Sequence, residues 1–348
     1  MRSIVTVCLV LGLMASAPAL AWNAHGHRTI TRLAVDGLPK EMPAWLKDPE
    51  VVARLAEQAC EPDRWRGTKR LVLGHELHPE HYLDAEDLEQ FGLTLDTIPR
   101  LRHEYTKAMI LAKERHPERV APYDPLKDLD RGKEWPGYLL HAIDQRFALL
   151  QSSFNTLRIL EALDESDPSG APQRAAALKQ ERENIIHFMG VLAHFMGDTA
   201  QPLHTTKHFN GWAGENPNGY TTDRNFHSYI DGRIVDIHRI DFDSMRPTLS
   251  YQRRINPADP WDDVLAYFRR SHEKVEPLYQ MQKDGSLTKA SGKELISERF
   301  RDAGETLCAL YVAAWEASKP TDAEVSAFVR FNDLRPPRNR RDSREEGR

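Results

Sequence analysis

H194-F-M-G-D-T-A-Q-P-L-H204 ends the second of two long helices that the sequence predicts, and H227-S-Y-I-D231 begins 23 residues after His204. In each H-x-x-x-D pair the histidine and the aspartate are one helical turn apart, so both side chains leave the same face of a helix. Imidazole nitrogens and carboxylate oxygens are ligands that zinc accepts, and His204 extends the set beyond one ion. With 15 His and 52 acidic residues in the chain, roughly two pairs of this spacing arise by chance. The pairs alone are therefore weak evidence for a metal site.

The segments around this stretch predict an all-α fold. Apolar residues at three-four spacing predict an amphipathic helix over 138–163, and a second long helix is expected over 175–198. Pro and Gly in D164-E-S-D-P-S-G-A-P-Q173 predict a loop between the two helices. The Pro, Gly, Asn and Thr residues between 201 and 225 predict an irregular loop that lines a site. No strand pattern of period two competes, and shorter helices are expected over 25–36, 51–60, 100–116, 260–281 and 293–318.

The composition favours one large domain. With 40% apolar residues the chain can bury a sizeable core. We expect a single mainly helical domain over 22–334, with long irregular loops around a cleft, rather than two domains.

The start of the chain is typical of a secretory signal peptide. Residues 1–21 combine one positive charge, an apolar run from Ile4 to Met14 and the small-x-small ending A19-L-A21. The apolar run is too short for a membrane anchor. We therefore expect a secreted or periplasmic protein that begins at Trp22 and has no stable membrane anchor. The absence of any N-x-[ST] sequon fits a bacterial exported protein.

The charge balance argues against tight binding of duplex nucleic acid, but not against chemistry at a cleft charged by metal ions. Loss of Arg2 with the signal peptide changes the formal net charge from −5 to −6, so no global basic field holds a polyanion. Residues 335–348 carry six Arg against three acidic residues and no apolar residue, which predicts a disordered charged tail. A role of this tail in tethering nucleic acid is the alternative. No protein partner is inferred from the sequence.

The cysteines leave two alternatives open. Cys8 is lost with the signal peptide, so Cys60 and Cys308 remain. In an oxidising compartment they can form one disulfide, and two separate buried thiols fit the sequence equally well.

Three further motifs carry potential ligands. The new N-terminus would be W22-N-A-H-G-H27, whose α-amino group and carbonyl can chelate an ion that His27 completes, although an aromatic residue and a histidine at a helix start explain it as well. A59-C-E-P-D-R-W-R66 contains Asp63, and H78-P-E-H-Y-L-D-A-E-D87 contains His81. Taken alone, these are an acidic helix end and a histidine-rich loop.

Together and in this order, the motifs resemble the zinc-dependent nuclease S-one/P-one family, which shares a superfamily with bacterial zinc phospholipase C. The resemblance runs from Trp22 to about Asp231. It implies a mainly helical fold that holds three zinc ions in a cleft. One zinc would lie between Asp63, His81, His194 and Asp198, a second would be held by His204, His227 and Asp231, and the third would take the Trp22 amine and carbonyl, His27 and the other oxygen of Asp198.

The same resemblance implies hydrolysis of a phosphodiester by a zinc-bound hydroxide. Asp84 would orient the attacking water, Arg66 would bind phosphate and Tyr82 would stack on a base. A solvated carboxylate, a surface arginine and a core tyrosine are the alternatives for these three positions. The remaining candidates are interpreted as loop histidines, His25, His75, His78 and His208, and as a core histidine, His187.

The spacing of the motifs favours a nuclease over a phospholipase. Trp22 to His27 is five residues, and the last ligand is Asp231, whereas the phospholipases have a longer first gap and a final Glu. The family nucleases usually carry an Asp and a Gly-Gly-Asn that shape the base pocket, but this chain has N210-G-W-A-G-E-N-P-N-G-Y220. We therefore expect an endonuclease that cleaves single-stranded DNA or RNA to 5′-phosphorylated products. The alternatives are a phospholipase C acting on phosphatidylcholine-like lipids and a non-enzymatic exported zinc-binding protein.

Overall fold

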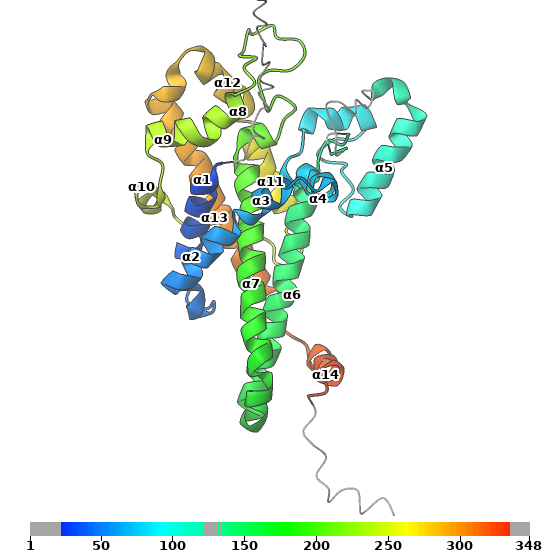
Figure 1. Ribbon diagram of the computed structural model, residues 1–348, viewed down its shortest axis with the longest axis vertical. Coiled ribbons are helices and arrows are strands. Elements are labelled where there is room, and N and C mark those ends of the chain that lie inside the picture. The colour runs from blue at the N-terminus through cyan, green and yellow to red at the C-terminus, as the bar shows by residue number, and fades with distance from the viewer. Residues whose placement is uncertain (1–21, 121–130, 133, 335–348) are drawn as a thin grey trace, which may run out of the picture.

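Two long helices, α6 (Leu139–Ser166) and α7 (Ala171–Ala200), run antiparallel through the molecule and form the axis of the fold (Figure 1). A computed structural model describes residues 22–120, 131–132 and 134–334. The predicted signal peptide and the predicted charged tail lie outside these residues. Throughout the described ranges the regular elements are helices, which confirms the all-α prediction. No helix in them is long and apolar enough to cross a membrane.

The other helices surround this pair. In chain order the α-helices besides α6 and α7 are α1 (Ala24–Asp36), α2 (Pro49–Gln58), α3 (Glu61–Arg66), α4 (Leu71–Leu77), α5 (Arg102–Arg115), α8 (Phe226–Ser228), α9 (Val235–His238), α10 (Phe242–Met245), α11 (Trp261–His272), α12 (Val275–Lys283), α13 (Ala290–Glu316) and α14 (Asp322–Phe331). Short 3-10 helices connect them. Three of these border the site described below, η2 (His78–His81), η3 (Ala85–Phe91) and η6 (Pro202–His204), together with one π-helical segment, η7 (Tyr229–Ile234).

The carboxyl-terminal half of α7 is the most deeply buried part of the fold. Every residue from Met189 to Ala200 is buried. The helices α1, α2, α11 and α13 all pack against α7. Two tyrosines fix it in place: Tyr311 on α13 donates a hydrogen bond to the carbonyl of Met189 (2.7 Å), and Tyr267 on α11 donates to that of Met196 (2.8 Å). A rigid, dry helix therefore carries the central motif.

The long helices were predicted better than their ends. The connection predicted over 164–173 is present but shorter, because α6 continues to Ser166 and α7 already begins at Ala171, with a 3-10 turn at Pro168–Gly170 between them. Pro172 lies in the first turn of α7, where its missing N–H costs no helical hydrogen bond. The predicted helix over 260–281 is two helices, α11 and α12, since Pro277 can be accommodated only in the first turn of a new helix.

Several helices escaped the sequence prediction. Four of them, α3, α4, α9 and α10, have too few turns for a clear period, and a fifth, α14, buries none of its residues. Figure 1 shows α14 as an appendage beside the closed end of the α6–α7 pair. A capping box stabilises the start of α14, since the side chains of Thr321 and Glu324 each accept a hydrogen bond from the backbone N–H of the other residue.

The two cysteines are free. Cys60 and Cys308 are both buried and form no disulfide with each other, which settles the alternative that the sequence left open. Burial raises the pKa of Cys308 to about 12.

Candidate metal centre

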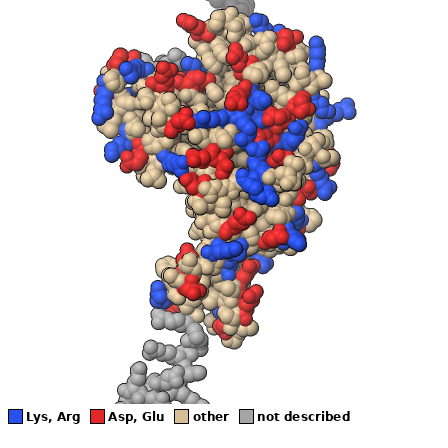
Figure 2. Space-filling view, turned by 180° about the vertical axis from the view of Figure 1, so that it is seen from behind, with Lys and Arg blue, Asp and Glu red and all other residues tan. Residues whose placement is uncertain are grey.

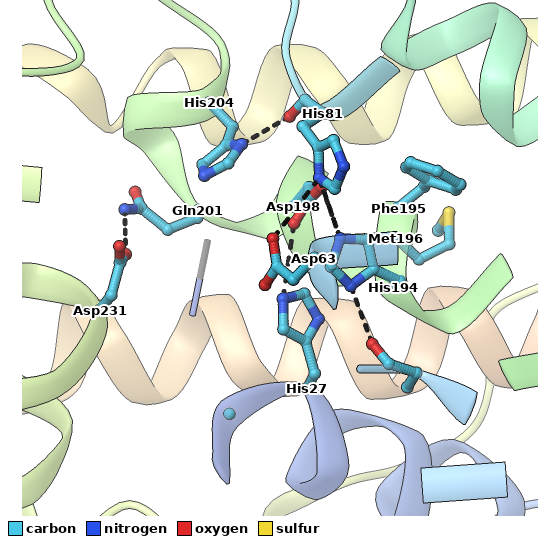
Figure 3. A network of polar contacts seen from close by, with 12 residues as sticks. His27, Asp63, His81, His194, Phe195, Met196, Asp198, Gln201, His204 and Asp231 are labelled. Carbon is cyan, nitrogen blue, oxygen red and sulfur yellow. Dashed lines mark hydrogen bonds and ion pairs between the residues drawn. The ribbon is translucent and has the colours of Figure 1, made fainter. Parts of the chain in front are cut away.

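The carboxyl-terminal turn of α7 places His194 and Asp198 side by side in the interior. Both side chains are fully buried, and His194 Nε2 lies 3.3 Å from Asp198 Oδ2. The spacing of four residues puts them on one face, as the sequence predicted. Figure 3 shows the side chains that converge on them from other elements.

The first convergence joins η2 to α7. His81 Nδ1 lies 2.9 Å from Asp198 Oδ2 and 3.0 Å from His194 Nε2. These three residues each offer one ligand atom within 4.8 Å of the others, so they form a group that could hold a metal ion. The fourth residue that the resemblance assigned to the first zinc, Asp63, is close by, with its Oδ1 3.9 Å from His81 Nδ1.

A second group of the same kind joins α1 and α3 to α7. It consists of His27, Asp63 and His194. His27 Nε2 also lies 3.5 Å from Asp198 Oδ1, the oxygen that does not face His81. The two oxygens of Asp198 therefore point to different histidines, an arrangement that suits a carboxylate bridging two ions.

The group of His27, Asp63 and His194 differs from the ligand sets that the resemblance implied. His27 was expected to serve the third ion with Trp22, but here it shares a group with Asp63 and His194, two residues expected at the first ion. His194 belongs to both groups, so the positions for the two ions adjoin each other.

The set predicted for the second zinc joins the two ends of the loop after α7, with His204 on η6 at one end and His227 and Asp231 at the other. His204 Nε2 faces His227 Nε2 at 3.0 Å, and His227 Nε2 lies 3.3 Å from Asp231 Oδ2. The other oxygen of Asp231 accepts a hydrogen bond of 2.7 Å from the Gln201 amide, which also holds the backbone N–H of Leu203. The amide leaves one carboxylate oxygen directed at the histidines.

Backbone carbonyls orient the imidazoles. His194 Nδ1 lies 2.8 Å from the carbonyl of Ala59, and His204 Nδ1 lies 2.5 Å from that of His81. A carbonyl only accepts, so each Nδ1 carries the proton and each Nε2 presents its lone pair to the centre. The sequence predicted neither of these two carbonyls and no role for Gln201. The spacing of the motifs contains no signal for the residues that form hydrogen bonds with the proposed ligands.

The electrostatics favour a cation. Burial and the neighbouring His194 lower the pKa of His27 to about 4, and burial with the charge of Arg66 lowers the pKa of His81 to about 3. Burial opposes ionisation of Asp198, but the histidines around it hold the pKa of this carboxyl well below its usual range. Near pH 7 the two imidazoles are thus neutral and the carboxylate is ionised, which is the state that binds a metal.

Two carboxylate oxygens test whether the site fits an ion. Among the described residues, none donates a hydrogen bond to Asp198 Oδ1 or to Asp231 Oδ2, although both atoms are buried. Burial and the charges of Asp63 and Asp198 also raise the pKa of Asp231 well above its usual range. A divalent cation supplies the charge that such atoms lack, so the donor set fits a metal.

The first described residue, Trp22, is folded onto the start of α1. Its ring is fully buried and lies 4.7 Å from that of Phe300, and a Cβ at Gly26 would meet the Trp22 Cβ at 2.6 Å. The next backbone N–H, of Asn23, lies 3.3 Å from the carbonyl of Asp231. Trp22 and Asn23 are thus close to the set predicted for the second zinc, and the role of the Trp22 amine and carbonyl as ligands stays a prediction.

Arg66 lies in this centre. Its guanidinium is 2.8 Å from Asp63 Oδ1, its side chain is 5% exposed, and its charge contributes to the lowered pKa values of His81, His204 and His227. A cation held within reach of the ligands, rather than on the surface, is what an anionic substrate requires.

Asp84 and Tyr82, the other two residues predicted to act on the substrate, have neighbours mainly outside the set of proposed metal ligands. Asp84 is buried, and burial with the nearby charges of Asp87 and Glu86 raises its pKa well above the usual range. The solvated-carboxylate alternative is therefore wrong. The hydroxyl of Tyr82 donates to the carbonyl of Gly132 at 3.1 Å, and its ring is half-buried.

Several of the remaining histidines were placed wrongly. His25 lies in α1 and bonds the carbonyl of Ile240, and His75 lies in α4, so neither is in a loop. His78 belongs to η2, where it lies in the first turn. His187 is half-buried, and its Nδ1 is hydrogen-bonded to the side-chain oxygen of Gln58 at 2.9 Å.

The loop between His204 and His227 folds around its own aromatic rings. Trp212 stacks on His208 with ring centroids 3.8 Å apart and meets the ring of Tyr279 edge-on at 5.2 Å. The backbone N–H of Trp212 bonds the carbonyl of Thr221, which closes the loop. One face of Trp212 is therefore already covered within the protein.

Comparison with models of protein families and with curated proteins gives no match.

Proposed function

We propose that this chain is an exported zinc-dependent phosphodiesterase of the nuclease type, which hydrolyses single-stranded DNA or RNA to 5′-phosphorylated products. The observation that supports it is the convergence on Asp198, where imidazoles from α1, η2 and α7 meet a buried carboxylate with one oxygen directed to each side. Such a donor set, with a buried arginine beside it, suits metal-assisted attack on an anion better than storage of an ion.

The proposed ligands form three sets. Asp63, His81, His194 and Asp198 would hold one zinc, and His204, His227 and Asp231 a second, while His27, Asp198 and the amine and carbonyl of Trp22 would hold a third. When bound, zinc activates water near neutral pH and neutralises charge that develops on the phosphate and the leaving group.

The chain's own residues orient and bind the substrate in this proposal. Arg66 binds a non-bridging phosphate oxygen, for which its position beside Asp63 is suited. Asp84 holds the attacking water in place, and the rise of its pKa through burial makes this carboxylate a better proton acceptor than a solvated one. Tyr82 presents one side of a ring to a base.

The surface agrees with a substrate held at the centre rather than along the protein. On the face shown in Figure 2, basic and acidic side chains are interspersed, with no continuous basic strip for a long polyanion. On this face, a long strand therefore finds no basic strip to which it could bind.

A substrate panel tests the proposal. The chain beginning at Trp22 is assayed against single-stranded DNA, RNA, short-chain phosphatidylcholine and a chromogenic phosphodiester, with zinc content measured by elemental analysis. We expect close to three zincs per chain and hydrolysis of the nucleic acids that a chelator abolishes. Activity on the lipid alone would assign the chain to the phospholipases, and bound zinc without any turnover would leave a zinc-binding protein. One zinc or none per chain would refute the ligand sets.

The N-terminal amine has its own test. A chain that keeps a short extension before Trp22 should lose one zinc and most of its activity. Full zinc content and full activity of the extended chain would remove the amine from the site.

A further inference from the structure

A short exposed stretch joins α3 to α4, and we call it the basic apolar tip, Gly67–Val72. Its sequence, G67-T-K-R-L-V72, contains two cations and no acidic residue. All six residues are exposed, with Leu71 at 63% and Val72 at 58%. Single exposed apolar residues are common, but two adjacent ones directly after two cations form an amphipathic surface of a defined kind.

The tip is a folded protrusion rather than a frayed end. The N–H of Gly67 bonds the carbonyl of Asp63 (3.0 Å) and that of Thr68 the carbonyl of Trp65 (3.2 Å), so the tip continues directly from α3. On its other side, the carbonyl of Arg70 accepts from Leu73 (3.0 Å) and Gly74 (3.3 Å). The backbone therefore holds Leu71 and Val72 outward at the start of α4.

The tip lies at the rim of the candidate metal centre. The helix that follows it, α4, packs against both α3 and η2. The first of these carries Asp63 and Arg66, and the second carries His81. Whatever binds the tip is thus brought next to the centre.

Another exposed leucine shows what distinguishes the tip. Leu101 is 73% exposed and also lies between two arginines. Arg100 is ion-paired with Asp259 and Asp262, and Arg102 with Glu80, so the charge around this leucine is neutralised. The tip combines exposed aliphatic side chains with cations in a stretch that has no acidic residue.

This combination matches a lipid surface. Cations next to aliphatic side chains bind anionic headgroups while the apolar groups enter the acyl boundary. A nucleic acid strand would contact Lys69 and Arg70 but would leave Leu71 and Val72 in water, since aliphatic side chains offer no ring on which a base can stack. We propose that the basic apolar tip docks this protein on the surface of an anionic phospholipid membrane, a property beyond the phosphodiesterase activity and independent of the substrate that the cleft hydrolyses.

Vesicle sedimentation tests the docking. The chain beginning at Trp22, with its metals, is mixed with vesicles of phosphatidylcholine alone or of phosphatidylcholine and phosphatidylglycerol. We expect binding to the anionic vesicles that weakens with salt. The variant K69Q/R70Q should bind them roughly 30-fold more weakly, and L71S/V72S about tenfold or more.

The control removes an exposed apolar residue elsewhere. Ile237 on α9 is 38% exposed and lies across α7 from α4 (Figure 1), so I237S should bind vesicles as the unaltered chain does. Hydrolysis of a short single-stranded oligonucleotide in solution should be the same in all four proteins, which separates docking from the proposed activity.

Three results would overturn the docking. The first is no binding of the unaltered chain to anionic vesicles. The second is equal binding by L71S/V72S and I237S. The third is a K69Q/R70Q variant that loses affinity for single-stranded DNA while its vesicle binding is unchanged, which would assign the tip to nucleic acid. Inactivity of every variant on every substrate would instead count against the proposed function and leave the docking result intact.

Discussion

Gly197 lies between the two central ligands of α7, and replacing it with alanine probes the packing of the centre directly. A Cβ at this position would come 2.6 Å from His27 Nδ1 and 3.0 Å from His27 Cε1. Contacts this short require the imidazole to move. The ring cannot retreat freely, because it is fully buried and stacks on His194 with centroids 4.2 Å apart.

The expected magnitude follows from two opposing terms. Alanine favours a helix over glycine by up to about 1 kcal/mol, while overpacking a close-packed interior costs about 1–3 kcal/mol. We expect a net loss of roughly 1–2 kcal/mol in the free energy of unfolding. Since the displaced side chain is His27, the variant should also hold fewer zinc ions, and its activity should fall.

Urea denaturation and elemental analysis measure the two effects. Gly232→Ala is the matched control, because the nearest atom to its Cβ would be Asn23 Nδ2 at an ordinary 3.5 Å. The control should keep its zinc and its stability. A Gly197→Ala protein with unchanged zinc content and unchanged or higher stability would refute the packing of His27 against α7.

Three further predictions concern the same molecule. Asp198→Asn should lower turnover by more than about 100-fold, which is the largest effect expected of a residue that only supports a ligand. Asp84→Asn should lower turnover by less. Equal losses in the two variants would contradict a bridging role for Asp198. In the folded, chelator-treated chain, burial lowers the pKa of His27 to about 4 and that of His81 to about 3, from the ordinary 6.5. Below pH 6.5 the unfolded state therefore binds more protons than the folded state. The free energy of unfolding should fall as the pH drops from 6.5 towards 4. A urea midpoint at pH 5 equal to that at pH 7 would count against this burial. The thiol of Cys308, with its pKa raised to about 12, should react with a thiol reagent only after denaturation, when two thiols per chain beginning at Trp22 should appear, and finding none would indicate a disulfide.

The sequence predicted the parts of the fold that have a long period. The helices α6 and α7 follow from many apolar residues at regular spacing, and the H-x-x-x-D pair of His194 and Asp198 lies on one face as expected. The break between α11 and α12 was missed, because it depends on one proline that a continuous apolar pattern conceals. Short helices such as α3 have too few turns to show a period at all.

The order of the motifs selected residues that the structure brings together, but it did not predict how they are grouped. Residues as distant as His27, Asp63 and His81 could be selected only through the order of motifs, since no local pattern says which segments meet. The neighbours of each ligand could not be predicted either. The carbonyl of Ala59 that orients His194, for example, is a backbone atom at the end of α2, and its position depends on how α2 packs against α7.

The aromatic loop between His204 and His227 suggests a route for redesign. Its two ends are the buried His204 and His227, which we propose as ligands, while the residues between them are closed by the Trp212–Thr221 hydrogen bond and by the rings around Tyr279. The backbone hydrogen bond between Trp212 and Thr221 does not depend on which side chains the loop carries. Libraries that vary the side chains of residues 213–219 would therefore test whether this loop sets the specificity of the candidate metal centre, on a scaffold in which His204 and His227 keep their positions.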